Sequence, residues 1–189
     1  YEKIRDGAGF QVHLLQGETG SGKTEIYVHL FDKILSEGAQ GLFLVPEISL
    51  TPQLEKRLEE RMGGRISVFH SRSSPKRRRE MVARALSGQA DIFLGARSAL
   101  LLPFTNLKMI VVDEEHDPSY KQSERGLYHA RDAAILRAYD LKIPVVLGSA
   151  TPSLESLVRV QRGEAHHHRL PSYHAKPRAA LEMVDLKDE

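Results

Sequence analysis

Short apolar runs alternate along the chain with longer segments that mix apolar and polar residues. Residues 41–45 and 109–112 contain no polar side chain, which is typical of strands that a parallel sheet buries on both faces. The pattern predicts strands at 11–16, 41–45, 66–69, 91–94, 108–112 and 144–148. It predicts helices at 23–37, 51–61, 75–87, 130–140 and 152–161.

Regular alternation of strands and helices indicates βαβ units, so we expect one α/β domain with a mostly parallel central sheet flanked by helices. The 189 residues suffice for one core. Ligands of such sheets bind at the carboxyl ends of the strands. Motifs that follow different strands should therefore meet at one edge of the sheet.

Composition narrows the picture only a little. Charged residues make up 28% and hydrophobic residues 41% of the chain, as in ordinary soluble domains. We find no secretory signal, and no apolar run is long enough for a bilayer. The absence of cysteine excludes disulfides and cysteine zinc sites. Net charge is +2, and the basic residues 76–79 are interpreted as a solvated helix face.

The most specific motif is GETGSGKT at residues 17–24, between a predicted strand and a predicted helix. This pattern is the phosphate-binding loop of P-loop NTPases, in which backbone N–H groups and the helix dipole form an anion site. Lys23 is expected to reach the β- and γ-phosphates of ATP, and Thr24 to bind Mg²⁺. The predicted nucleotide-binding residues are Gly17, Glu18, Thr19, Gly20, Ser21, Gly22, Lys23, Thr24 and Glu25.

A second motif follows the apolar run at 109–112, where two adjacent carboxylates occupy positions 113 and 114. A buried strand that ends in Asp-Glu is the Walker B arrangement. Asp113 is predicted to hold Mg²⁺, and Glu114 to orient or deprotonate the attacking water. With Lys23, these are the predicted catalytic residues; Thr24 and Asp113 are the predicted metal ligands.

A third motif, Ser149-Ala150-Thr151, follows the last predicted strand. Its hydroxyls are expected to bond the Asp-Glu loop, including His116, and to sense the state of the nucleotide. Simple GTPases and P-loop kinases do not need this element, whereas motor ATPases that act on nucleic acid carry it.

The chain changes character from about residue 163. Three histidines at 166–168 and nearby prolines predict an exposed loop rather than a metal site, because a metal site needs spaced and oriented ligands. A short strand is expected at 181–186, and residues 1–6 resemble part of a helix. We therefore expect residues 1–189 to form one domain of a longer protein, with 163–189 leading to a further lobe.

The three motifs together resemble motifs I, II and III of superfamily 2 helicases. Finer matches, which include LVPEISLTPQ, GARSA, VDEEHDPSYKQ, YHARDA and GSATPSLE, resemble the PriA family of replication-restart helicases. The resemblance implies a RecA-like, ATP-binding first lobe of a bacterial, cytoplasmic 3′-to-5′ DNA helicase that acts at stalled or branched forks. It implies ATP and Mg²⁺ as cofactors. Its implied partners are single-stranded and forked DNA, primosome proteins and single-stranded-DNA-binding protein, with no membrane.

The resemblance also implies a DNA track along motif Ia (Pro46, Glu47 and Ser49) and motif Ib (Gly95–Ser98), and an aromatic-rich loop at 119–131. Hydroxyls, backbone N–H groups and cationic side chains suit phosphate contacts, and tyrosines suit base stacking. For each tyrosine, packing onto its own domain is an equal alternative. The implied DNA-binding residues are Pro46, Glu47, Ser49, Gly95, Arg97, Ser98, Tyr120, Lys121, Tyr128 and Arg131, with Thr51 and Arg125 beside them.

The second lobe of the family, with its arginine finger and cysteine zinc site, lies outside this sequence. The isolated lobe is therefore expected to be inactive in unwinding. Three alternatives remain: another superfamily 2 translocase, a non-catalytic interaction platform, and a P-loop kinase. The intact residues of motifs I and II argue against a dead site, and no acceptor-substrate lid is apparent for a kinase.

Overall fold

A central parallel sheet organises the structure, a computed structural model in which residues 4, 9–70, 73–122 and 127–171 are described. Within these residues the sheet has seven strands in the order β3-β4-β2-β5-β8-β1-β9, and every neighbouring pair is parallel. The strands are β1 (Val12–Gln16), β2 (Gln40–Leu44), β3 (Ile66–Phe69), β4 (Asp91–Gly95), β5 (Leu107–Val112), β8 (Val145–Ser149) and β9 (His166–Arg169).

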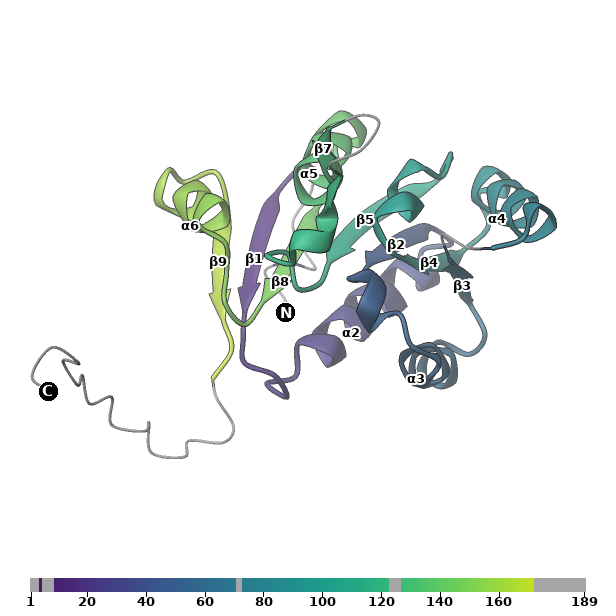
Figure 1. Cartoon of the computed structure of the whole chain (residues 1–189), viewed down its shortest axis with the longest axis horizontal. Coiled ribbons are helices and arrows are strands. Elements are labelled where there is room, and N and C mark those ends of the chain that lie inside the picture. Colours follow the sequence, from purple (N-terminus) through teal and green to yellow (C-terminus); the bar gives the residue numbers. More distant parts are fainter. Residues whose placement is uncertain (1–3, 5–8, 71–72, 123–126, 172–189) are drawn as a thin grey trace, which may run out of the picture.

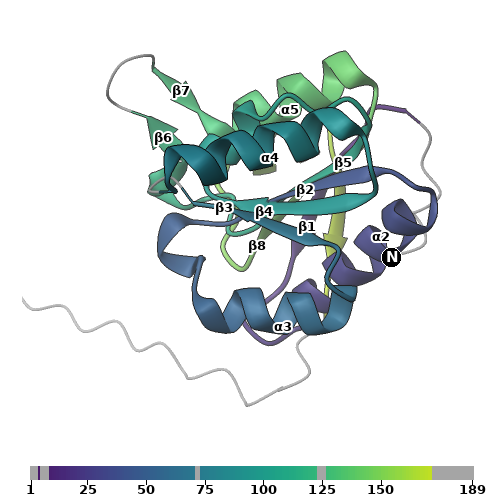
Figure 2. The same ribbon diagram turned by 90° about the vertical axis from the view of Figure 1, so that its right-hand side faces the viewer.

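Helices cover both faces of this sheet, as Figures 1 and 2 show. One face carries α2 (Lys23–Ser36) and α3 (Pro52–Met62), and the other carries α4 (Pro75–Ser87) and α5 (Ala130–Leu141). The last helix, α6 (Leu154–Gln161), lies at the edge of the sheet near β9 (Figure 1). The predicted α/β architecture is confirmed, with helix boundaries within two residues of the predicted ones. None of the helices described is long and apolar enough to cross a membrane.

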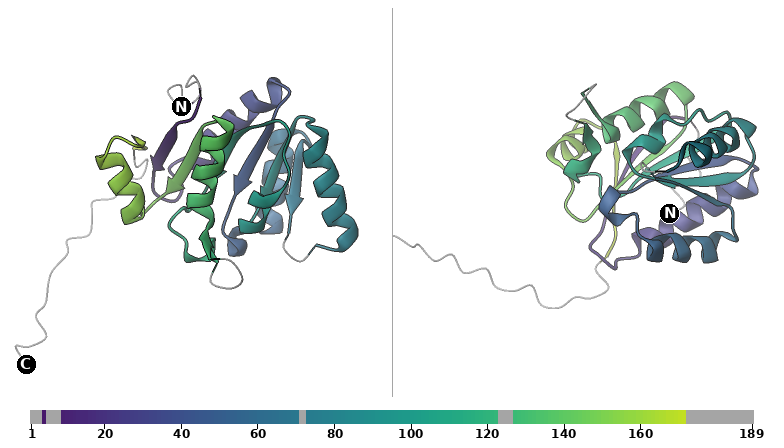
Figure 3. Two further views of the ribbon diagram at one scale, coloured as in Figure 1. Left: turned by 90° about the horizontal axis from the view of Figure 1, so that it is seen from above. Right: turned by 45° about the vertical axis from the view of Figure 1, so that its right-hand side comes forward.

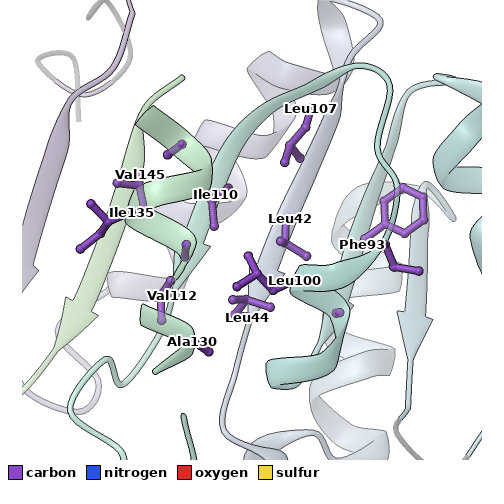
Figure 4. Close-up of a cluster of buried hydrophobic side chains, with 14 of the residues drawn as sticks. Leu42, Leu44, Phe93, Leu100, Leu107, Ile110, Val112, Ala130, Ile135 and Val145 are labelled. Carbon is purple, nitrogen blue, oxygen red and sulfur yellow. The ribbon is translucent and has the colours of Figure 1, made fainter. Parts of the chain in front are cut away.

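Alternation along the buried strands divides the core between the two faces. In β2, Leu42 and Leu44 join the cluster under α4 and α5, whereas Phe43 joins the cluster under α2 and α3. Figure 4 shows the first cluster, in which Leu100 and Ile110 contribute from neighbouring segments. Because side chains of a strand point alternately to opposite faces, continuous apolar runs are needed where both faces are covered.

Local signals explain where the helices begin and end. The Thr51 hydroxyl accepts a hydrogen bond from the backbone N–H of Leu54, and Pro52 occupies the first turn of α3. That helix ends at Gly63, which has φ +60°. The Thr51 hydroxyl oxygen thus caps α3.

The histidine run is the main correction to the predicted fold. Instead of an exposed loop, residues 166–169 form β9, which pairs in parallel with β1. The backbone of β9 satisfies an edge of β1 that would otherwise be open, and the His13 ring on β1 contacts the rings of His166 and His168. Amino-acid composition does not show which distant segments pair through their backbones. The polar histidine run therefore did not predict a strand.

Shorter elements sit at the carboxyl ends of the strands. A two-stranded hairpin of β6 (Lys121–Gln122) and β7 (Tyr128–His129) precedes α5. Three 3-10 helices lie nearby, at Glu47–Ser49, Arg97–Leu101 and Pro118–Tyr120. Figure 3 shows how these connections gather along one edge of the sheet. The strand predicted at 181–186 lies outside the described residues, as does most of the helix predicted at 1–6.

Candidate functional site

The phosphate-binding loop leaves β1 and enters α2. Gly17 donates its backbone N–H to the Ser149 carbonyl at 3.0 Å, which ties the start of the loop to the end of β8. Gly20 has φ +83° and Gly22 has φ +94°, conformations that glycine adopts without the steric cost of a Cβ. Lys23 is the first residue of α2, so the helix N-terminus opens directly behind the loop.

The interior of this loop fits an anionic ligand. Lys23 is only 7% exposed, and its ammonium donates to the Gly17 carbonyl across the loop at 2.7 Å. The Ser21 hydroxyl oxygen is buried and has no hydrogen-bond partner among the described residues. A polar atom buried without a partner is costly unless a ligand completes its bonding. The residues present therefore suit the phosphates of a nucleotide.

Glu25 does not join this loop, although the sequence predicted a nucleotide contact. Its carboxylate accepts hydrogen bonds from the guanidinium groups of Arg57 and Arg61 on α3. The side chain consequently bridges α2 and α3. Charge complementarity with the next helix, which a motif pattern does not include, decides its direction.

The two carboxylates predicted for motif II come directly after β5. Asp113 donates its backbone N–H to the Leu44 carbonyl at 2.9 Å, and its Oδ1 accepts from the Tyr27 hydroxyl at 2.9 Å. Burial raises the pKa of Asp113, an effect that the hydrogen bond from Tyr27 opposes. The Glu114 carboxylate lies 3.6 Å from the Lys23 ammonium. The structure thus brings the two halves of the predicted site together.

The side chains at this site suit Mg²⁺, whose coordination shell phosphates and waters complete, better than a metal that is bound by protein side chains alone. Asp113 lies at the strand end, and Thr24 follows Lys23 in the first turn of α2. In the part of the chain that the structure describes, no group of three or more His, Asp or Glu side chains could hold a metal ion. Mg²⁺ in nucleotide sites takes one or two carboxylates and completes its shell with phosphates and waters, which fits this arrangement.

Motif III contacts motif II as the sequence predicted. The His116 Nδ1 lies 2.7 Å from the Ser149 hydroxyl, and its Nε2 lies 3.4 Å from the Thr151 hydroxyl. The backbone N–H of Thr151 donates to the Ser149 hydroxyl oxygen at 3.0 Å. Ala150 connects the two hydroxyl residues. These contacts link Ser149 and Thr151 directly to His116, two residues after Glu114.

A buried ion pair that the sequence did not reveal lies behind motif II. Glu115 is fully buried, and its carboxylate accepts from Arg131 Nη1 at 3.1 Å. The same carboxylate accepts from the Ser153 backbone N–H at 2.7 Å and from the Ser156 hydroxyl at 2.9 Å. These bonds join the loop after β5 to the N-termini of α5 and α6. Sequence patterns treat adjacent acidic residues alike, so they give no sign that only Glu115 points inward.

Two of the residues predicted to contact DNA are buried in the structure. Arg131 is only 4% exposed because Glu115 holds it, so it cannot present its charge to a DNA backbone. Tyr120 is 1% exposed, and its hydroxyl donates to the Asp113 carbonyl at 2.7 Å. Burial of a ring with its hydroxyl satisfied is the alternative that the sequence left open.

The other predicted DNA residues line the carboxyl edge of the sheet. Pro46 and Gly95 are buried, whereas Glu47 and Lys121 are exposed and Ser49 and Tyr128 are half-buried. A small hollow of about 90 Å³ is bounded by the predicted motifs Ia and Ib and by the hairpin segment. Its lining residues are Glu47, Ala96, Arg97, Ser98, Ser119 and Gln122. Arg125 lies outside the described residues.

Arg97 holds two of these segments together. Its Nη1 donates to the carbonyls of Ser119 and Lys121, at 3.0 Å and 2.9 Å. The neighbouring Ser98 hydroxyl oxygen is buried and lacks a partner among the described residues. The structure therefore places Arg97 between the predicted DNA track and the hairpin.

Known proteins are similar to this chain in sequence and in fold. The family model of DEAD/DEAH box helicases matches residues 4–160. The chain is 50% identical over 184 residues to replication restart protein PriA of Haemophilus influenzae, covering 96% of this chain and 25% of that protein. It is 44% identical over 196 residues to PriA of Bacillus subtilis, covering 100% and 24%. The chain thus spans about a quarter of the length of these curated relatives.

Solved structures show the same fold at lower identity. RecG bound to a three-way DNA junction matches with a TM-score of 0.60 and 22% identity, over 84% of this chain and 20% of that one. A DEAD box protein from Methanococcus jannaschii matches with a TM-score of 0.60 and 18% identity, over 89% and 47%. These likenesses confirm the predicted RecA-like fold. The chain belongs to the DEAD/DEAH box helicase family, and the resemblance to PriA that its motifs predict is confirmed along nearly its whole length.

Proposed function

We propose that this chain is the ATP-binding motor lobe of a bacterial, cytoplasmic 3′-to-5′ DNA helicase that restarts replication at stalled or branched forks. ATP hydrolysis at the lobe is coupled to translocation on single-stranded DNA. Support comes from the site and from the relatives, which are named replication restart proteins.

One observation carries the proposal: three motifs from distant parts of the sequence touch one another at the carboxyl edge of the sheet. Lys23 of motif I lies 3.6 Å from Glu114 of motif II. His116 of motif II lies 2.7 Å from Ser149 of motif III. A P-loop kinase has no use for the second contact, and a non-catalytic lobe has no use for the first.

The residues divide the work of phosphoryl transfer between them. Lys23 and the N–H groups of the loop bind the β- and γ-phosphates, and Thr24 and Asp113 hold Mg²⁺. When bound, Mg²⁺ neutralises the charge that develops on the phosphate oxygens. Glu114 orients the attacking water and accepts its proton. His116, Ser149 and Thr151 link this chemistry to the DNA side.

DNA binds along the edge formed by Pro46, Glu47, Ser49, Gly95, Arg97, Ser98, Lys121 and Tyr128. Exposed Lys121 and half-buried Tyr128 offer a phosphate contact and a stacking surface. RecG, which shares this fold, has been solved on a three-way DNA junction. Primosome proteins and single-stranded-DNA-binding protein complete the proposed partners, on the strength of the relatives' role in restart.

We further propose that residues 1–189 form one lobe and that residues beyond them supply a second lobe with the catalytic arginine. The isolated lobe then binds nucleotide weakly and does not unwind DNA, because closure of two lobes excludes water and places the arginine.

The test measures ATP hydrolysis with and without single-stranded DNA, on this chain and on the full-length protein that contains it. We expect DNA to stimulate hydrolysis only in the full-length protein, and Lys23→Ala to abolish it. Brisk hydrolysis by this chain alone would contradict the split site. No stimulation in either protein would favour an interaction platform. Preference for forked DNA over a plain 3′ tail separates a restart helicase from other translocases.

A further inference from the structure

Tyr27, on the second turn of α2, belongs to none of the motifs above but touches the centre of the site. Its side chain is fully buried, and its hydroxyl lies 2.9 Å from Asp113 Oδ1. An ionised carboxylate can only accept, so the hydroxyl donates. An ordinary tyrosine hydroxyl, with a pKa of about 10, carries its proton at physiological pH.

The ring has little freedom to move. It packs edge-on against Phe43 of β2, with 5.4 Å between ring centroids, inside the cluster under α2. Protein interiors are packed densely enough that a buried aromatic ring in such a contact holds one orientation. The hydroxyl is consequently a fixed donor.

Gly148, at the end of β8, makes room for this donor. A Cβ atom at position 148 would lie 1.7 Å from the Tyr27 hydroxyl oxygen and 3.0 Å from Asp113 Oδ1. No side chain larger than hydrogen fits there while the hydrogen bond exists. Three elements thus converge on one carboxylate oxygen: α2 supplies the donor, the loop after β5 the acceptor, and β8 the space.

We propose that Tyr27 is a positioning residue for the magnesium carboxylate: by occupying Oδ1 it fixes the rotamer of Asp113 and directs the other oxygen to the metal. The inference rests on the proposed function, since it presupposes that Asp113 holds Mg²⁺. A carboxylate ligand held by a hydrogen bond from a neighbour is better oriented and is lost less readily from its metal. A purely structural tyrosine would stabilise the fold without changing metal affinity.

The test compares Tyr27→Phe with the unaltered sequence, both in the full-length protein that contains this chain, in a binding experiment that needs no turnover. Mn²⁺ replaces Mg²⁺, and its affinity is read from electron paramagnetic resonance in the presence of a non-hydrolysable ATP analogue. We expect Tyr27→Phe to weaken Mn²⁺ binding about tenfold or more, while affinity for the metal-free analogue stays unchanged. Tyr139→Phe, at a 61% exposed position, serves as the matched control and should change neither value.

A substitution at Gly148 should disturb the same hydrogen bond between Tyr27 and Asp113. Gly148→Ala is expected to displace the hydroxyl and to weaken Mn²⁺ binding as Tyr27→Phe does. In the Tyr27→Phe background it should cause a smaller further loss, because the hydrogen bond is already absent and only the contacts of the Cβ with the ring carbon Cζ at 2.9 Å and with Asp113 Oδ1 at 3.0 Å remain. If Gly148→Ala fails to fold, the Tyr27→Phe comparison decides alone.

Equal or tighter Mn²⁺ binding by folded Tyr27→Phe would overturn the proposal, because the hydroxyl would then be neutral or would compete with the metal. Independent losses from the two substitutions would overturn it as well. Failure of the proposed function gives a different result. Either the unaltered full-length protein would not bind Mn²⁺ and the ATP analogue, or Lys23→Ala would bind Mn²⁺ and the analogue as tightly as the unaltered protein does.

Discussion

Glu114 and Lys142 are the non-glycine residues with positive φ among those described, and only Glu114 is in the site. Its φ of +46° brings the Cβ close to the following carbonyl group, a strain of about 1–2 kcal/mol. Bonds on either side hold this conformation: the Glu115 N–H donates to the Gly148 carbonyl, and the Asp117 N–H donates to the Glu114 carbonyl. The fold thus maintains a strained residue where the proposed chemistry needs its carboxylate.

Replacing Glu114 by glycine should relieve this strain, whereas alanine should keep it. Since the extra freedom of glycine in the unfolded chain offsets part of the gain, we expect Glu114→Gly to be about 1 kcal/mol more stable than Glu114→Ala. Urea denaturation measures the difference. Both variants should lose ATP hydrolysis in the full-length protein, because neither carries the proposed base.

The same pair of substitutions at Glu80, an exposed position within α4, provides the control. There glycine should be the less stable variant by about 1 kcal/mol, because an ordinary helix interior favours alanine. Equal stability of the two variants at position 114 would contradict the strain at Glu114.

The edge of the sheet formed by β1 and β9 depends on a cluster of histidines. His13 is 1% exposed, and its Nδ1 lies 3.1 Å from His168 Nε2. Burial, and then the nearby rings of His168 and His166, lower the pKa of His13 from 6.5 to about 4. Folding therefore favours the neutral ring.

This depressed pKa predicts how stability depends on pH. Above pH 6.5 the ring is neutral in both states and contributes no dependence. Between pH 6.5 and about 4 the unfolded chain binds a proton that the folded chain excludes, so stability falls as pH falls, by at most about 1.4 kcal/mol per unit. Urea denaturation across this range should show the loss, and His13→Asn should reduce it.

Other groups contribute to the same range and must be separated from His13. Burial also lowers the pKa of His129 and His167, which act in the same direction and remain in the variant. His29→Asn, at an exposed position of α2, provides the comparison with loss of a histidine outside this cluster. An unaltered slope in His13→Asn would show that β9 is not held by a neutral His13.

The loops that follow several strands meet at one edge of the sheet, so a ligand bound there contacts many parts of the lobe at once. The Gly17 N–H bonds to the end of β8, and the Asp113 N–H bonds to the end of β2, so the site spans the middle of the sheet. A ligand that binds only the folded chain stabilises all of these connections together.

We therefore expect Mg²⁺ and ADP to raise the melting temperature of this chain. At 100 times the dissociation constant the stabilisation is about 2.7 kcal/mol, or roughly 5–10 °C for a chain of this size. Calorimetry of the chain and of Lys23→Ala measures it, and the variant should show no shift. Lys56→Ala, at an exposed position of α3, should shift as the unaltered chain does. A shift retained in Lys23→Ala would place nucleotide elsewhere.

Sequence by itself determined the strands and helices of the sheet apart from β9, the phosphate-binding loop, the two carboxylates and the family. These features depend on local periodicity or on residue types at fixed spacing, which are written along the chain. A strand that is buried on both faces must be apolar throughout, and a loop that turns around phosphate must have glycine at fixed positions.

Only the tertiary structure decided which side chains face one another. Glu25 turned to α3, Arg131 and Tyr120 turned into the domain, and the histidine run became β9. Tyr27 gained a role that no motif predicted. In each case the direction depends on a partner more than 15 residues away or on burial of a charge or hydroxyl, and a hydrogen bond between distant segments leaves no periodic signal in the sequence.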